Sequence, residues 1–177
     1  MDEAKIVGVW LTPDMKWEKN TKELTRKAYS RMSMLTKLKY AGVGIDDLID
    51  VYILFIRSVL EYCTVVWHSS LTNELINRIE MVQKSCLRVI LGESYISYGA
   101  ALEMCNFDTL IDRRETRCLT FAKKCLKHPI HRRMFPLNSN NGDGNYKSRE
   151  KYSVNFARTN TYQKSAVPYL QRLLNAS

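Results

Sequence analysis

Apolar residues recur at helical spacing in the first part of the chain. Asn20 or Thr21 is expected to cap a first helix, in which the apolar residues from Leu24 to Leu38 share one face and which Gly42 ends. The spacing predicts an amphipathic helix with its apolar stripe turned toward a core.

Two more helices are predicted after it. The segment LIDVYILFIRSVLEY, which follows Ile45, is apolar around most of its circumference, and this pattern indicates a helix buried among others. The next helix runs from a cap at Thr72 to Gly92, with apolar residues at helical spacing from Leu75 onward. Trp67, in the connection, is interpreted as a cap on the resulting bundle rather than a binding platform.

The C-terminal half predicts a short helix over residues 100–105 and a longer one over residues 109–127, ended by Pro129. Four side chains of the longer helix are expected to face the core: Leu110, Cys118, Phe121 and Cys125. Three cations lie on a neighbouring ridge at i, i+4 and i+11: Arg113, Arg117 and Lys124. Such a ridge can follow a phosphate backbone.

Residues 5–11, KIVGVWL, have the composition of a strand and stop at turn-forming residues. The predicted fold class is therefore mainly α, a helical bundle with a short N-terminal β-strand or hairpin and a basic, partly irregular C-terminal tail. The expected segments are a strand or hairpin (1–17), a three-helix bundle (18–92), a helical extension (93–137), a flexible loop (138–145) and a basic aromatic tail with a short terminal helix (146–177).

Charge is unevenly distributed along the chain. Residues 1–112 hold 13 Lys/Arg against 15 Asp/Glu, whereas residues 113–177 hold 14 against 3, so the net charge of +9 belongs to the C-terminal third. A field of this sign attracts nucleic-acid phosphates or anionic membranes. Because no apolar run reaches the length of a membrane span, we expect nucleic acid as the partner and no membrane. The alternative is a basic surface that only keeps the protein soluble.

The tail adds aromatic residues to this charge. Beyond the loop NSNNGDGN (138–145), four aromatic residues alternate with five cations: Tyr146, Tyr152, Phe156 and Tyr162 with Lys147, Arg149, Lys151, Arg158 and Lys164. Rings that stack on bases and cations that contact phosphates suit single-stranded nucleic acid. An equally supported alternative is that these aromatic residues only pack against the helical bundle.

Patterns for catalysis and metal binding are weak. Cys125-x2-His128-x2-His131 offers three candidate ligands rather than four, and Cys125 lies on the apolar face, so no metal site and no cofactor is expected. The acidic doublet that starts the second helix lacks the further acid on a strand that two-metal nucleotidyl transfer needs. Five scattered cysteines predict reduced thiols in an intracellular protein, nuclear or cytoplasmic.

Six segments carry a resemblance to a known family: IVGVWLTPDMKW (6–17), KAYSRMSMLTKLKYAGV (27–43), LEYCTVVWHSSLT (60–72), RIEMVQKSCLRVILG (78–92), RRETRCLTFAKKCLKHP (113–129) and YQKSAVPYLQRLLN (162–175). Together they resemble the part of non-LTR retrotransposon reverse transcriptases that follows the palm, particularly in elements of the jockey kind. The segment 60–72 is the most specific of the six. Val7 stands where the family has leucine.

The resemblance implies a helical thumb that holds template and primer, with the catalytic aromatic-Ala-Asp-Asp motif lying before the matched region, so the chain is not expected to be an enzyme by itself. The expected nucleic-acid-binding residues are Lys22, Arg26, Lys37, Arg113, Arg117, Lys124, Arg132, Arg133, Lys147, Arg149, Lys151 and Arg158. The alternative is a non-catalytic helical protein-interaction module or a decayed relic of an element. The strand at residues 5–11 would lack its palm partner, and we expect its open edge to favour self-association.

Overall fold

A computed structural model of the chain describes residues 3–138 and 151–177. These residues are mainly helical, with a two-stranded antiparallel sheet near the N-terminus, so the predicted fold class is confirmed. The chain forms two compact units, residues 1–63 with 71–113, and residues 64–70 with 114–177. The sequence-based boundaries did not anticipate that residues 64–70 group with the C-terminal part.

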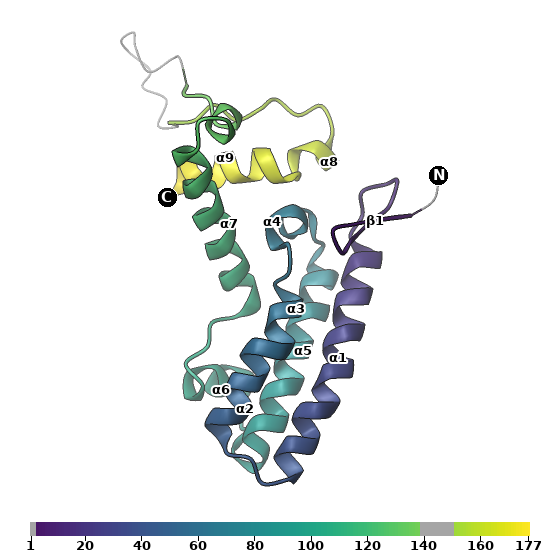
Figure 1. Ribbon diagram of the computed structural model, residues 1–177. Helices are drawn as coiled ribbons and strands as arrows, with labels where there is room; N and C mark the ends of the chain where they lie inside the picture. Colours follow the sequence, from purple (N-terminus) through teal and green to yellow (C-terminus); the bar gives the residue numbers. More distant parts are fainter. Residues whose placement is uncertain (1–2, 139–150) are drawn as a thin grey trace. The chain divides into compact units, whose positions relative to one another are not determined.

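Three long helical rods make up most of the first unit, and Figure 1 shows them side by side. They are α1 (Glu18–Tyr40), α5 (Asn73–Leu91) and a continuous rod of α2 (Ile45–Val51), the π-helix η1 (Tyr52–Arg57) and α3 (Ser58–Leu60). The apolar stripe predicted for the first helix is turned inward. Fully buried core residues from the three rods include Ala28, Leu35, Leu48, Ile56, Ile79 and Leu87.

The ends of these helices match the sequence signals in part. Thr72 caps α5 as predicted, because its Oγ1 accepts a hydrogen bond from the Leu75 N–H at 3.3 Å. The start of α1 was predicted wrongly: the helix begins at Glu18, and Asn20 lies inside it. The Asn20 side chain has another task, since its Oδ1 accepts a hydrogen bond from the backbone N–H of Trp10 at 3.2 Å.

The N-terminal residues form a hairpin, which is one of the two predicted forms, and its turn interrupts the single strand expected over 5–11. β1 (Ala4–Ile6) and β2 (Val9–Leu11) pair antiparallel, with Ile6 opposite Val9. The turn residues Val7 and Gly8 have φ angles of 47° and 82°, the left-handed conformation that a two-residue hairpin turn demands. The Tyr62 hydroxyl donates to the Val7 carbonyl at 2.9 Å and anchors this turn. The strand expected to be unpaired therefore has a partner within the chain.

The first unit is completed by η3 (Gly92–Ser94), α6 (Tyr98–Met104) and the first turn of α7 (Leu110–Lys127). Both α6 and α7 lie within two residues of their predicted positions. Thr109 stands just before α7, where its Oγ1 accepts a hydrogen bond from the Asp112 N–H at 3.2 Å. This is the bond of an N-cap residue, and it fixes where α7 begins.

The second unit has a small core of its own. It contains α4 (Thr64–Trp67), η2 (His68–Ser70), the part of α7 from Arg114, η4 (His131–Met134), α8 (Asn160–Gln163) and α9 (Ala166–Ala176). Its apolar cluster consists of Cys118, Ala122, Cys125, Phe135, Tyr152, Leu170 and Leu174. Figure 1 shows α9 running across α7. Trp67 is buried but belongs to this unit, which differs from its predicted place on the three-helix bundle.

Candidate nucleic-acid interface

The division into units sharpens the charge asymmetry. The second unit carries 13 Lys/Arg against 3 Asp/Glu, a net charge of +10, whereas the first unit carries 14 against 15, a net charge of −1. Within the described residues of the second unit, Glu115 is the only acidic side chain. The surface of this unit is therefore the place where phosphate groups would meet the strongest positive field.

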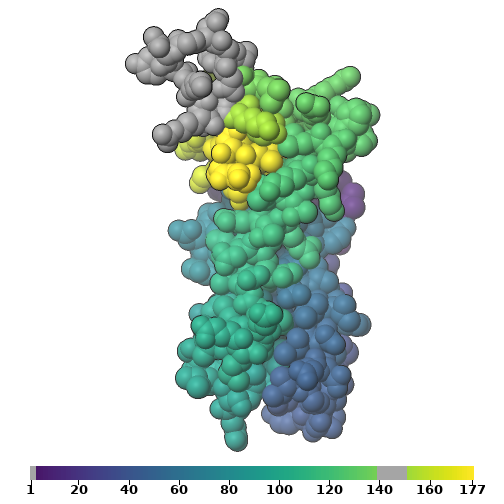
Figure 2. Space-filling model, turned by 90° about the vertical axis from the view of Figure 1, so that its left-hand side faces the viewer, coloured from purple at the N-terminus to yellow at the C-terminus, as the bar shows by residue number. Residues whose placement is uncertain are grey.

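Helix α7 separates its buried and charged faces. Cys118, Ala122 and Cys125 point into the apolar cluster, while Arg117 and Lys124 are exposed. Figure 2 shows the green residues of α7 and η4 at the surface, next to the yellow residues of α9. The helix thus holds cations at the surface through an ordinary amphipathic pattern.

Phe121 was assigned to the wrong face of α7. It is 42% exposed, and the inner positions belong instead to Ala122 and, more unexpectedly, to Arg114. Arg114 is fully buried, although charged side chains are rarely found in a core unless they are paired. Sequence periodicity places Arg114 on the same stripe as Cys118 and Ala122, but its charge made it look like a surface residue.

Arg113, the first cation of the predicted ridge, is paired with a buried carboxylate. Its Nε donates to Glu61 Oε1 at 2.6 Å, and its Nη2 lies 3.4 Å from Glu61 Oε2. The Glu61 side chain is only 2% exposed and that of Arg113 is 24% exposed. This hydrogen bond raises the pKa of Arg113 above its ordinary value. Arg113 belongs to the first unit and has a structural task there.

The segment after α7 carries the next group of predicted cations. Arg132 and Arg133 lie in η4 and are exposed. The rings of His128 and His131 stack with their centroids 4.4 Å apart just before them. Sequence reasoning missed Lys123 and Lys127, which are also exposed on α7 and extend its positive surface. Their position opposite the buried stripe is the signal that could have identified them.

The cations predicted on the first helix lie in the first unit. Lys22, Arg26 and Lys37 are all exposed on α1. Arg26 is paired with Glu23, with 3.0 Å between Nη2 and Oε2. This pair and the overall charge of −1 make the first unit a weaker place for phosphate binding than the second.

The predicted residues of the C-terminal tail differ in their exposure to solvent. Lys151 and Arg158 are exposed, and Phe156 is 85% exposed, whereas Tyr152 is buried in the apolar cluster of the second unit. Tyr152 therefore packs against the core, as the alternative interpretation of the tail expected, whereas Phe156 remains accessible. Lys147 and Arg149, and the loop expected at 138–145 after its first residue, lie outside the described residues.

A buried polar pair lies in the core of the second unit. Arg114 Nε donates to His68 Nδ1 at 3.3 Å, and the Tyr169 ring meets the imidazole edge-on at 5.8 Å. Burial, and then the charge of Arg114, lower the pKa of His68 from 6.5 to about 4. The imidazole is neutral near pH 7 and accepts the hydrogen bond from Arg114, which orients that side chain.

Other chemistry is sparse in the described part of the chain. No group of three or more His, Cys, Asp or Glu residues is placed to hold a metal ion there. Burial raises the pKa of Cys86 to about 12 and that of Cys118 to about 11, so neither is an activated thiol. None of the described helices is both long and apolar enough to cross a membrane.

Comparisons with models of protein families, with curated proteins and with solved structures found no match for this chain.

Proposed function

We propose that the chain is a non-catalytic nucleic-acid-binding module that corresponds to the thumb and post-thumb region of a non-LTR retrotransposon reverse transcriptase. Its template–primer would be RNA, DNA or a hybrid of the two, held through the phosphate backbone with little preference for sequence. Catalysis in such a polymerase belongs to a palm that the matched segments do not include.

One observation carries this proposal. The second unit has a net charge of +10, and its exposed cations continue from α7 into η4. Backbone phosphates are contacted by Lys and Arg side chains on helices, and such contacts supply most of sequence-independent affinity. The six segments that resemble the reverse-transcriptase family favour the same class of ligand.

The test is fluorescence anisotropy with an RNA–DNA hybrid and with single strands. The variant R117Q/K124Q/R132Q removes three exposed cations from the second unit, and K22Q/R26Q/K37Q removes three from the first. We expect affinity to fall by roughly tenfold or more in the first variant, because every cation that neutralises a phosphate adds strongly to affinity at low salt. For the matched variant we expect a change of less than about threefold.

Two results would count against the proposal. Equal decreases in the two variants would contradict an interface on the second unit. A folded wild-type chain that binds no nucleic acid at low salt would contradict nucleic-acid binding altogether.

The second candidate function is protein interaction. Leu54 and Phe55 are adjacent in η1 and are 70% and 51% exposed, which is unusual for large apolar residues in the middle of a helical rod. If the chain binds no nucleic acid, sedimentation of the wild type and of L54S/F55S distinguishes this function. Association that the substitutions abolish would support it.

A further inference from the structure

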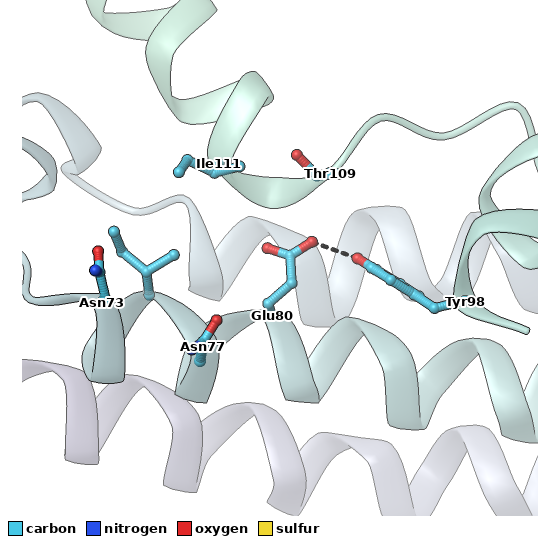
Figure 3. A pocket seen from close by; sticks show the side chains of 7 residues that line it. Asn73, Asn77, Glu80, Tyr98, Thr109 and Ile111 are labelled. Carbon is cyan, nitrogen blue, oxygen red and sulfur yellow. Dashed lines mark hydrogen bonds between the residues drawn. The ribbon is translucent and has the colours of Figure 1, made fainter.

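A groove in the first unit serves to join helices. It lies between α5 and the start of α7, and Figure 3 shows Glu80 and Tyr98 hydrogen-bonded inside it. Glu80 Oε1 also accepts a hydrogen bond from the Leu110 N–H at 3.1 Å, and its Oε2 is buried. The carboxylate of Glu80 thus connects α5 with α6 and α7. Phe156, in the second unit, is by contrast open to solvent.

Phe156 is the most exposed aromatic residue among those that the structure describes in the second unit, at 85%. Single apolar residues at a surface are common, so exposure alone does not indicate a function. Phe156 is distinguished by two further features, a fixed backbone on both sides and exposed cations nearby.

Hydrogen bonds fix the backbone on both sides of Phe156. The Asn155 N–H donates at 2.9 Å to Oε1 of Gln171, which is fully buried. Asn155 Nδ2 donates at 3.2 Å to the hydroxyl of Tyr162, a residue of α8, and Thr159 caps that helix. Only residues 156–158 separate Asn155 from the cap. The ring therefore projects from a short segment that is held at both ends, and little backbone ordering opposes the binding of a ligand to it.

The same buried amide places Phe156 near exposed arginines. Gln171 Nε2 donates to the Met134 carbonyl at 2.7 Å and to Asn155 Oδ1 at 3.3 Å. Met134 is the last residue of η4, whose two arginines are exposed. Arg158, two positions after Phe156, is exposed as well. The ring therefore belongs to the positive surface of the second unit.

An exposed aromatic ring among cations is the arrangement that binds single-stranded nucleic acid without sequence preference. A base of a single strand stacks on the ring, while Lys and Arg contact the phosphates on either side of it. In a duplex both faces of an internal base are covered by the neighbouring bases. Such a ring therefore acts on unpaired bases only.

We propose that Phe156 stacks on an unpaired nucleobase while Arg158 and the arginines of η4 contact the phosphates that flank this base. The inference rests on the proposed nucleic-acid binding and adds a distinction that the basic surface alone does not make. Duplexes and single strands both present phosphates, but only a single strand presents free base faces. The ligand of this site is a single strand or the single-stranded part of a template.

The first experiment compares oligothymidylate with a duplex of the same length by fluorescence anisotropy, using the full chain. In F156A the affinity for oligothymidylate should fall about fivefold or more, which is the loss expected for one base–aromatic stack. The affinity for the duplex should change by less than about twofold. The matched variant Y40A removes an aromatic ring that is 88% exposed on the first unit, and it should change neither affinity.

A second measurement separates stacking from charge. F156A should lower the logarithm of the binding constant for oligothymidylate equally at every salt concentration, because stacking releases no counterions. R158Q should instead make the slope against the logarithm of salt concentration shallower by about 0.7. The tryptophan emission of F156W, corrected for that of wild type, should be quenched by oligothymidylate. A shallower slope in F156A, or emission of F156W that does not respond, would overturn the inference.

The anisotropy data also decide against the inference in three cases. These are unchanged affinity of folded F156A for oligothymidylate, an equal loss for the two probes, and an equal loss in Y40A. Altered sedimentation of F156A together with unchanged binding would make the ring a protein contact and overturn the inference as well. If wild type binds both probes and F156A behaves like it, only the stacking assignment fails; if wild type binds neither probe, the proposed function fails too.

Discussion

At the scale of single residues, two ionisable side chains are part of a core, although residues of their type usually lie at the surface. His68 and Arg114 are both buried in the second unit and hydrogen-bonded to each other. Because His68 must stay neutral there, its protonation state is linked to folding.

His68 should make stability depend on pH. Its pKa falls from 6.5 to about 4 on folding, so the unfolded chain binds the extra proton first as the pH is lowered. The contribution of neutral His68 is therefore complete above about pH 7 and is lost progressively from pH 6.5 toward pH 4. We expect the free energy of unfolding to fall by up to about 2 kcal/mol between pH 6.5 and pH 5.

Urea denaturation at several pH values measures this dependence. H68Q should flatten the curve in that range, whereas H131Q, which changes an exposed histidine, should leave it as in wild type. A wild-type curve that H68Q does not alter would contradict the linkage.

Arg113 should matter for folding more than for binding. R113A removes a charged partner of the buried Glu61 carboxylate, and breaking a buried ion pair from one side costs about 3–5 kcal/mol when both partners are fully buried. Since Arg113 is partly exposed, we expect a destabilisation of about 2 kcal/mol. K124A, on the exposed face of the same helix, should change the unfolding free energy by less than about 0.5 kcal/mol. Similar destabilisation in the two variants would show that the pair contributes little.

At the scale of elements, the N-terminal hairpin depends on an unfavourable turn residue. Val7 is β-branched and has φ of 47°, a conformation that costs a non-glycine residue roughly 1–2 kcal/mol. The packing that holds it there includes the hydrogen bond from Tyr62 to its carbonyl. The turn should therefore be easy to improve.

V7N should stabilise the hairpin by about 1 kcal/mol, because Asn-Gly is the preferred pair for a turn with two left-handed residues. Hydrogen exchange at the Ile6 and Val9 amides, compared with the same rate in wild type, measures the effect. Y62F should accelerate exchange at the same amides. Faster exchange in V7N would mean that the Val7 side chain makes contacts worth more than its backbone strain.

The elements that sequence predicts best are those set by local signals. The cap at Thr72 and the apolar spacing from Leu75 were enough to define α5, since both act within one helix. A hairpin was one of the two forms predicted here, but the position of its turn was not predicted, because Val7 is a poor turn residue. Its conformation is supported by a contact with Tyr62, 55 positions away in sequence. Buried Arg114 was missed for the same kind of reason, as its partner His68 lies 46 positions away.

The same distinction between local signals and long-range contacts applies to the candidate site. The exposure of Arg117 and Lys124 follows from the helical pattern of α7 alone. The involvement of Arg113 with Glu61 does not, because an ion pair over 52 positions leaves no trace in the spacing of one helix. The groove at Glu80 joins residues of α5, α6 and α7, and no sequence motif pointed to it.

At the scale of the whole molecule, the two compact units of the fold also differ in net charge. The first unit is nearly neutral overall and has the larger helical core, while the second has a small core and a net charge of +10. A charge of this size on one compact unit opposes its own folding through repulsion, and bound phosphates would reduce that repulsion. Under the proposed function, nucleic acid should therefore stabilise the chain against unfolding.

The salt dependence of binding tests this account most directly. The logarithm of the binding constant for single-stranded RNA is measured against the logarithm of salt concentration for wild type and for R117Q/K124Q/R132Q. We predict a steep negative slope for wild type that becomes shallower by about 2 in the variant, because each phosphate neutralised on a single strand contributes about 0.7 to the slope. A shallow wild-type slope, or a slope that the three substitutions leave unchanged, would contradict the claim that the second unit binds the phosphate backbone.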